Sequence, residues 1–382
     1  MVKYHNSLKS QISNLKSKQM KVVIAGGGTG GHIFPAVAIG HALQRLKPGT
    51  ELLFVGANGK MEMEKVPQEG FNIVGLDIAG FNRSNLLKNL SLPFKLWKSR
   101  QQANKVIADF KPDVVVGVGG FASFPMLYAA QNSGIPTLIQ EQNSFAGKSN
   151  KILGKRAKAV CVAYDGMDRF FPKDKIIVTG NPVRAKISQS NVTKQEGLDA
   201  FGLNNNKKTI LVVGGSLGAK SINEAIAKGL KELNDMNVQL IWQTGKLFIN
   251  EGKAAAASYG KGFVVTEFIK NMEYAYAAAD VVISRAGALA SAELCIAGKP
   301  VIFVPYPFAA EDHQTSNAKA LVEHSAAMMV KDNESQDLLM KKLHTLMEDE
   351  NMQSVLAENI VKHGIKDADE RIAKQVIAIS GK

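Results

Sequence analysis

One pattern recurs along the chain after Met20: a short apolar run rich in β-branched residues, a glycine-rich turn, and a segment with helical spacing. Continuous apolar strands that alternate with helices are typical of a parallel sheet covered on both faces. The pattern predicts strands at residues 21–25, 51–55, 113–116, 137–139, 159–163 and 175–179, and again at 209–213, 239–243, 263–265, 281–284 and 301–304. Helices are predicted at 35–46, at 336–347 and at about 367–379.

The alternation pauses once, in a polar stretch at residues 188–208 that is rich in Asn and Lys, and we expect a domain boundary close to it. A length of 382 residues also suits two domains better than one. We therefore predict an α/β fold of two doubly wound, Rossmann-like domains, residues 20–182 and 183–364, which face each other across a cleft at the carboxyl ends of their strands. Residues 365–382 are predicted to form a terminal helix that packs back on the N-terminal domain.

Residues 1–19 are rich in Lys, Ser and Asn and contain no acid. We interpret them as a disordered basic extension, with a transit-like leader as one alternative and Met20 as the true start as another. No apolar stretch reaches the ~20 residues that cross a bilayer, and the first residues lack the apolar region of a signal peptide.

The formal net charge is +13, which favours anionic partners over mere solubility. No signature of a nucleic-acid-binding motif accompanies the charge, so anionic lipid or a phosphorylated substrate is expected and nucleic acid is not. Cys161 and Cys295 stand far apart in apolar runs, as buried thiols in a reducing compartment do.

Glycines cluster in three predicted strand-to-helix turns, at residues 26–31, 117–120 and 214–218. The first turn matches G-x-G-x-x-G, but the second strand ends without the acid that binds a dinucleotide ribose, so NAD and FAD are not expected. None of the three is a P-loop. Backbone amides at helix N-termini bind phosphate, and the three turns together suggest one diphosphate ligand per domain. Close packing is the alternative for any single turn.

Seven segments form a collinear set that runs from Met20 nearly to the last helix. They are GGGTGGHIFPAVAIG at 26–40, EQN with AG at 141–147, GNPVR at 180–184, GGSLGA at 214–219, TEFI at 266–269, RAGALASAE at 285–293 and DHQTSNA at 312–318. In these segments the chain resembles the MurG family of peptidoglycan glycosyltransferases, which have the GT-B fold. One departure is Phe124 before Pro125, where that family usually has a small residue, and it puts the details of acceptor binding in question.

The resemblance implies an inverting transferase that moves N-acetylglucosamine from UDP-N-acetylglucosamine to undecaprenyl-diphosphoryl-N-acetylmuramoyl-pentapeptide, converting lipid I to lipid II. It implies a place in cell-wall biogenesis, cell shape and cell division, with wall-synthesis and division proteins as candidate partners. The expected location is peripheral, on the cytoplasmic face of the plasma membrane. A GT-B enzyme for another lipid acceptor and a non-catalytic scaffold are the alternatives.

Inversion by direct displacement needs a base for the acceptor hydroxyl and stabilisation of the departing UDP. His32 is the expected base, with Glu141 sharing or holding that role, and a packing role is the alternative for His32. Loop amides and Arg184 can meet the leaving-group charge, so no metal and no other cofactor is expected. The expected substrate-binding residues are Thr29, Gly30, Gly31, Asn143, Arg184, Ser216, Ile269, Ala288, Leu289, Ala290, Ser291, Ala292, Glu293 and Gln314.

For four of these residues we expect a particular role, and each has an alternative role. Glu293 is expected to accept hydrogen bonds from both ribose hydroxyls, or else to complement its helix dipole or pair with Lys299. The backbone of Ile269 reads the uracil, or the residue belongs to the core. Gln314, with Asn317 one helical turn later, reaches sugar hydroxyls or is solvated. Arg184 is alternatively an interdomain surface charge.

Residues 81–100 mix apolar side chains with cations, which suits an anionic membrane surface without spanning it. An ordinary amphipathic helix packed on the sheet is the alternative. The apolar members are Phe81, Leu86, Leu87, Leu90, Leu92, Phe94, Leu96 and Trp97, and the cations are Arg83, Lys88, Lys95, Lys98 and Arg100.

Overall fold

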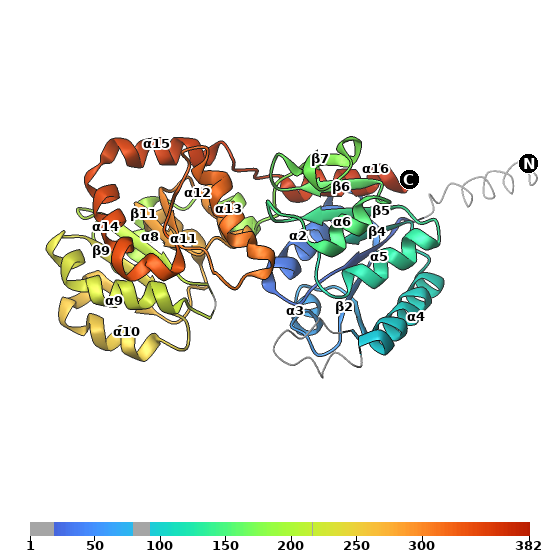
Figure 1. Cartoon of the computed structure of the whole chain (residues 1–382), viewed down its shortest axis with the longest axis horizontal. Helices are drawn as coiled ribbons and strands as arrows, with labels where there is room; N and C mark the ends of the chain where they lie inside the picture. The colour runs from blue at the N-terminus through green and yellow to red at the C-terminus, as the bar shows by residue number, and fades with distance from the viewer. Residues whose placement is uncertain (1–18, 79–91, 216) are drawn as a thin grey trace, which may run out of the picture.

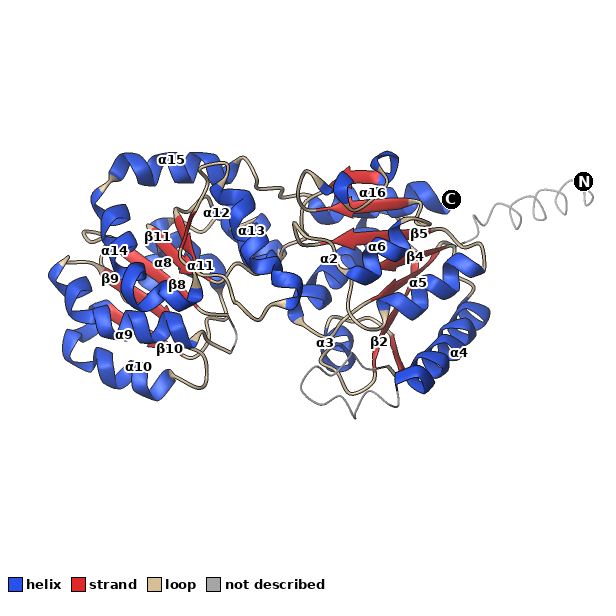
Figure 2. Ribbon diagram, in the orientation of Figure 1, coloured by secondary structure: helices blue, strands red, loops and turns tan. Residues whose placement is uncertain are grey.

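The computed structural model describes residues 19–78, 92–215 and 217–382, which form two α/β domains joined by two crossover segments (Figure 1). The basic extension at residues 1–18, most of the predicted membrane segment (79–91) and Ser216 lie outside the described residues. In both domains helices cover the two faces of a parallel sheet (Figure 2). The predicted pair of doubly wound domains is confirmed.

The N-terminal sheet has the strand order β3-β2-β1-β4-β5-β6-β7, and all its strands are parallel. The strands are β1 Lys21–Ala25, β2 Glu51–Ala57, β3 Ile73–Leu76, β4 Val114–Gly117, β5 Thr137–Glu141, β6 Ala159–Val162 and β7 Ile176–Val178. The helices are α2 Gly30–Leu46, α3 Glu62–Gln68, α4 Leu92–Phe110, α5 Ser123–Asn132 and α6 Lys148–Gly154, with short 3₁₀ turns η2 Met167–Arg169 and η3 Lys173–Lys175. Because β1 lies beside both β2 and β4, the glycine turns after β1 and β4 become neighbours.

The C-terminal sheet repeats this order as β10-β9-β8-β11-β12-β13, again all parallel. Its strands are β8 Thr209–Val213, β9 Gln239–Gln243, β10 Phe263–Thr266, β11 Val281–Ser284, β12 Val301–Phe303 and β13 Met328–Met329. Its helices are α7 Ala185–Ser188, α8 Lys194–Phe201, α9 Lys220–Asp235, α10 Ile249–Ala256, α11 Met272–Ala278, α12 Ala288–Ala297, α13 His313–Val322, α14 Ser335–Glu348 and α15 Glu350–Val361, with 3₁₀ turns η4 Ala257–Gly262, η5 Ala310–Asp312 and η6 Asp332–Glu334.

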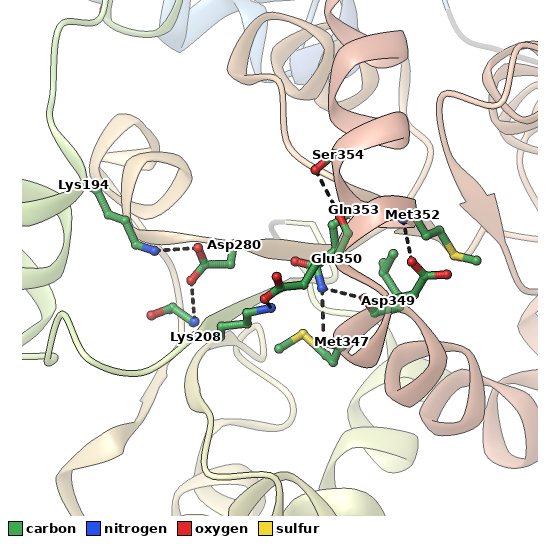
Figure 3. Close-up of polar contacts among 11 residues, drawn as sticks. Lys194, Lys208, Asp280, Met347, Asp349, Glu350, Met352, Gln353 and Ser354 are labelled. Atoms are coloured by element: carbon green, nitrogen blue, oxygen red, sulfur yellow. Dashed lines mark hydrogen bonds and ion pairs between the residues drawn. The ribbon is translucent and has the colours of Figure 1, made fainter.

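The polar stretch at residues 188–208 is folded, not a bare linker. Thr193 and Glu196 form a capping box at the start of α8, and Leu198 is buried in the core of the C-terminal domain. Ion pairs Lys194–Asp280 (2.5 Å) and Lys208–Glu350 (2.8 Å) tie this segment to the strand and helix beside it (Figure 3). The crossover therefore lies just before this stretch, at the turn that contains Asn181.

The terminal helix α16 Ala368–Ser380 returns to the N-terminal domain and packs on α2 (Figure 1). Ile372, Ala373 and Val376 are fully buried in the core cluster that contains Met20 and β1. Arg45 of α2 pairs with Asp369 at 2.9 Å across this contact. The last helix of the chain is thus part of the first domain.

Helix α4 covers the N-terminal sheet with one face and exposes apolar side chains on another. Ser99, Ala103 and Val106 are buried, whereas Phe94 is 65 % and Trp97 59 % exposed. The two exposed rings stack with centroids 6.1 Å apart. Within residues 19–78, 92–215 and 217–382, no helix is long and apolar enough to cross a membrane. Helix α4 therefore packs on the sheet with one face and presents apolar side chains to solvent with another, and its binding to a membrane stays a prediction.

Candidate active site

The first two glycine turns pack directly against each other at the carboxyl edge of the N-terminal sheet. The amide of Gly27 donates to the carbonyl oxygen of Gly119 at 3.2 Å, and a Cβ at Gly120 would lie 2.1 Å from the Gly27 oxygen. Both Gly27 and Gly120 have positive φ, which disfavours any other residue. At these positions the packing alternative is correct.

The start of α2, at Gly31, is more open. A Cβ at Gly31 would meet nothing closer than the Thr29 hydroxyl at 3.5 Å, and Thr29 precedes α2 without capping it through its side chain. Uncapped amides at the start of a helix attract anions. Thr29, Gly30 and Gly31 therefore keep the geometry of a phosphate site.

His32 lies in the first turn of α2 with its ring orientation fixed. Nδ1 is 3.1 Å from the carbonyl oxygen of Gly27 and 3.4 Å from the Thr29 hydroxyl. A carbonyl only accepts, so Nδ1 carries the proton and Nε2 keeps a free lone pair. Burial lowers the pKa of His32 below its usual value, and the charge of His313 on the opposite domain lowers it further, against the raising effect of the Gly27 bond. A neutral imidazole with an available nitrogen can accept a proton.

Glu62 supports this turn, and the sequence reasoning missed it. Its buried carboxylate accepts from the amides of Gly28 (2.8 Å) and Ala57 (3.0 Å). Glu62 lies a few residues after the end of β2. An acid near the end of the second strand is the sequence signal that could have found it. Its carboxylate binds the protein's own glycine turn and not a ribose.

Glu141 is buried at the end of β5, and donors from its own loop occupy both of its oxygens. Oε1 accepts from the amide and side chain of Asn143, and Oε2 accepts from the amide of Gly147 (3.2 Å) and from Asn150 (2.8 Å). Burial raises the pKa of Glu141, whereas these hydrogen bonds lower it. This geometry holds the 141–147 loop in shape.

Asn317 joins the two domains, so the expectation that it is solvated or reaches a sugar is wrong. It is fully buried, and its Oδ1 accepts from the amide of Ser144 at 2.9 Å. Its Nδ2 donates to Asn143 and to the carbonyl oxygen of Ala286, both at 3.2 Å. The second bridge is Asn181, which donates to the carbonyl oxygens of Gln142 (2.9 Å) and Ala288 (3.4 Å).

Arg184 and Glu293, predicted separately, meet in the structure. The guanidinium Nη2 lies 2.9 Å from Glu293 Oε1, and the hydroxyl of Tyr276 donates to Oε2 at 3.1 Å. Burial raises the pKa of Glu293, and Arg184 opposes that shift. The alternative pairing of Glu293 with Lys299 is therefore wrong, and Arg184 is the partner.

The start of α12 offers a second anion site beside this pair. Gly287 precedes the helix without a side-chain cap, and the first turn consists of Ala288, Leu289 and Ala290. Ser291 is fully buried, and Ala292 faces the domain interface. Small side chains at an uncapped N-terminus let a phosphate approach the amides.

Two further residues predicted to bind substrate, Ile269 and Gln314, already form hydrogen bonds within the protein. The amide of Ile269 already donates to Gln243 at 2.8 Å and its side chain is buried, so only its carbonyl remains for a base. The side-chain oxygen of Gln314 accepts from the amide of Tyr306 at 3.0 Å, which fixes that side chain at the start of α13.

Phe124 does not obstruct the second glycine turn. It is the second residue of α5, its ring stacks on Tyr128 with centroids 5.9 Å apart, and it packs against the N-terminal core. No group of three or more metal-ligating side chains gathers in the part of the chain that the structure describes.

Comparison with known proteins gives two family matches that together span most of the chain. Residues 22–162 match the glycosyltransferase family 28 N-terminal domain, and residues 209–372 match the family 28 C-terminal domain. A UDP-N-acetylglucosamine–N-acetylmuramyl-(pentapeptide) pyrophosphoryl-undecaprenol N-acetylglucosamine transferase of Phocaeicola vulgatus is 52 % identical over 96 % of this chain and 98 % of its own length. The transferase of the same description from Bacteroides thetaiotaomicron is 50 % identical over 95 % of this chain and 98 % of its own.

Among solved structures, the chain is similar to MurG of Acinetobacter baumannii. The TM-score is 0.77 at 30 % sequence identity, with 94 % of this chain and 99 % of the other covered.

Proposed function

Because this chain belongs to glycosyltransferase family 28, and within it to the N-acetylglucosamine transferases matched above, we propose that it transfers N-acetylglucosamine from UDP-N-acetylglucosamine to undecaprenyl-diphosphoryl-N-acetylmuramoyl-pentapeptide. The product is the lipid-linked disaccharide precursor of peptidoglycan. The observation that carries the proposal is identity of about half of all residues over nearly the full length of a relative so described.

We assign the donor to the C-terminal domain. The uncapped start of α12 suits the diphosphate, and the Glu293 carboxylate beside it suits the two ribose hydroxyls. Arg184 lies against the same carboxylate and is 37 % exposed, so it can turn partly to the leaving diphosphate without leaving Glu293. The carbonyl of Ile269 and the amide nitrogen of Gln314 complete the expected contacts to uracil and sugar.

The acceptor belongs to the N-terminal domain, with its diphosphate at Thr29, Gly30 and Gly31. An oxygen of the acceptor sugar attacks the anomeric carbon as the bond to the β-phosphate oxygen of UDP breaks. The proton of that hydroxyl goes to Nε2 of His32, which the Gly27 bond leaves free. Glu141 and Asn143 act by positioning the 141–147 loop against the second domain.

The membrane surface is the third proposed partner. Phe94 and Trp97 are exposed on α4. This helix lies on the flank of the N-terminal domain that is away from the C-terminal domain (Figure 1). Lys95, Lys98 and Arg100 on the same helix add cations, although Lys98 pairs with Asp77 at 2.8 Å. We propose peripheral attachment to anionic lipid on the cytoplasmic face of the membrane that carries the acceptor, close to wall-synthesis and division proteins.

Product analysis tests the proposed reaction. The purified protein, UDP-N-acetylglucosamine and the lipid-linked N-acetylmuramoyl-pentapeptide should give an acceptor heavier by one N-acetylhexosamine, seen by mass spectrometry. A lipid diphosphate that lacks the N-acetylmuramoyl sugar should gain nothing. Modification of that second lipid alone would instead support the alternative, a GT-B enzyme for another lipid acceptor.

A further inference from the structure

A cavity of about 500 Å³ lies between the two domains where the chain crosses from one to the other. Gly180 and Asn181 of the first crossover border it, as do Lys362, His363 and Ile365 of the second. We call it the hinge cavity. Cavities of this volume commonly hold small-molecule ligands.

The hinge cavity is distinct from the proposed donor and acceptor sites. Of the residues assigned to substrate, only Ala292 borders it. On α13 the polar lining residues Ser316 and Lys319 lie on the opposite face from Gln314, as a rotation of about 100° per residue requires, and Glu323 follows the end of the helix. A ligand in the hinge cavity would therefore not overlap the UDP-sugar.

Three cations from three separate segments border the hinge cavity: Arg169 of η2, Lys319 of α13 and Lys362 of the second crossover. Arg169 donates to the carbonyl oxygen of Ser144 (2.8 Å) and Lys362 to the side chain of Asn359 (2.8 Å). Among the described residues, none of the three cations forms an ion pair with a carboxylate. Their charge is therefore free for an external anion.

The other titratable groups leave the hinge cavity cationic. Asp165 and Glu323 border it as well, so the cations exceed the carboxylates by one before the histidines are counted. His324 and His363 stand with ring centroids 4.9 Å apart at its edge. Burial and His324 lower the pKa of His363 while Asp165 raises it, and a bound anion would favour its charged form.

We propose that the hinge cavity binds a small phosphorylated anion that bridges the two domains. The three cations, none of which pairs with a carboxylate among the described residues, supply the charge from both sides of the cavity. Since the lining comes from both domains and both crossovers, such a ligand stabilises this relative placement of the domains. Its affinity and that of the donor are then coupled by linkage.

Hydrogen-exchange mass spectrometry with inorganic pyrophosphate tests this proposal. The full-length protein is first saturated with UDP, and ionic strength is matched with sodium chloride. Exchange should slow at residues 163–169, 316–324 and 362–365. The Lys319→Ala/Lys362→Ala variant should need about tenfold more pyrophosphate for the same protection, whereas Lys228→Ala/Lys374→Ala, which removes two exposed lysines elsewhere, should behave like wild type.

Either of two results would overturn the proposal. One is the absence of protection in these three segments, including the case in which protection is confined to the glycine turn at residues 26–31. The other is equal protection in wild type and in the Lys319/Lys362 variant. Both lysines are exposed, so a melting temperature close to that of wild type verifies that the variant is folded.

Discussion

Single residues decide the chemistry, and His32 is the first to test. Its Nδ1 is committed to Gly27, so replacing it with Ala removes the one free imidazole nitrogen in the first turn. Turnover should fall by ~10²–10⁴, the usual loss for a general base, while UDP-N-acetylglucosamine affinity changes little. His41→Ala, on the same helix, is the matched control. Turnover of His32→Ala within about threefold of wild type would return His32 to a packing role.

The pH dependence of the wild-type enzyme follows from the same geometry. A base must be neutral, and burial lowers the pKa of His32 below 6.5. The kcat/KM profile should therefore be flat from neutral pH downward until it falls on an acidic limb whose midpoint is below 6.5. This limb should be absent from the residual activity of His32→Ala. A limb centred well above 6.5 would contradict the assignment.

Glu293 can be tested against its own hydrogen-bond partner. Glu293→Ala should weaken UDP-N-acetylglucosamine by roughly ten- to a hundredfold, the loss of a charge-assisted ligand bond. It also leaves the buried Tyr276 hydroxyl without an acceptor, at a cost of about 1–3 kcal/mol in stability. Tyr276→Phe removes that hydroxyl but keeps the carboxylate and Arg184, so donor affinity should persist. A Glu293→Ala variant that melts early yet binds donor normally would make the residue purely structural.

At the scale of elements, α16 is the clearest case of distant segments sharing a core. Ile372 is fully buried against the N-terminal domain, so Ile372→Ala should destabilise that domain by about 2–5 kcal/mol. The exposed Lys374→Ala on the same helix is the control. Limited proteolysis of the N-terminal domain should accelerate in the first variant only, and equal rates would mean that α16 is not part of that core.

The exposed face of α4 carries the membrane prediction. A Phe94→Ser/Trp97→Ser variant should bind anionic vesicles less well than wild type in a sedimentation assay, and salt should weaken the wild-type binding. Phe308→Ser, at an 80 % exposed aromatic residue of the C-terminal domain, is the control. Equal binding of wild type to neutral and anionic vesicles would remove the electrostatic part of the proposal.

Most elements could be predicted because their signals are local. Strands at Lys21–Ala25, Thr209–Val213, Gln239–Gln243 and Val281–Ser284 match the predicted bounds, since each is a continuous apolar run that ends in a turn. The edge strands β3 and β13 were missed. They are only 4 and 2 residues long and partly exposed, so they lack such a run.

The sequence could indicate which residues are candidates for the site, but not which of them contact each other. Arg184 and Glu293 are 109 positions apart, and Asn317 and Ser144 are 173 apart, so only the folded chain brings them together. Glu62 escaped prediction because nothing in its short helix distinguishes a buried carboxylate from a solvated one. Glu141 was expected to share or hold the role of base, and the sequence could not show that its carboxylate accepts four hydrogen bonds from its own loop.

At the scale of the whole molecule, the proposed reaction needs two domains that hold two diphosphates on opposite sides of one cleft. With these proposed roles neither half can complete the reaction alone, because the proposed base His32 belongs to one domain and the proposed donor-binding pair Arg184–Glu293 to the other. Asn181 and Asn317 hold the halves in register through hydrogen bonds that cross the interface. Donor cleavage should therefore depend on the acceptor.

The measurement that tests this most directly is UDP release from UDP-N-acetylglucosamine, followed with and without the lipid-linked N-acetylmuramoyl-pentapeptide. We expect one UDP to be released for each N-acetylglucosamine transferred when the acceptor is present, and almost none when it is absent. UDP release at the same rate without the acceptor, or no release with it, would contradict the assignment of this chain as the transferase.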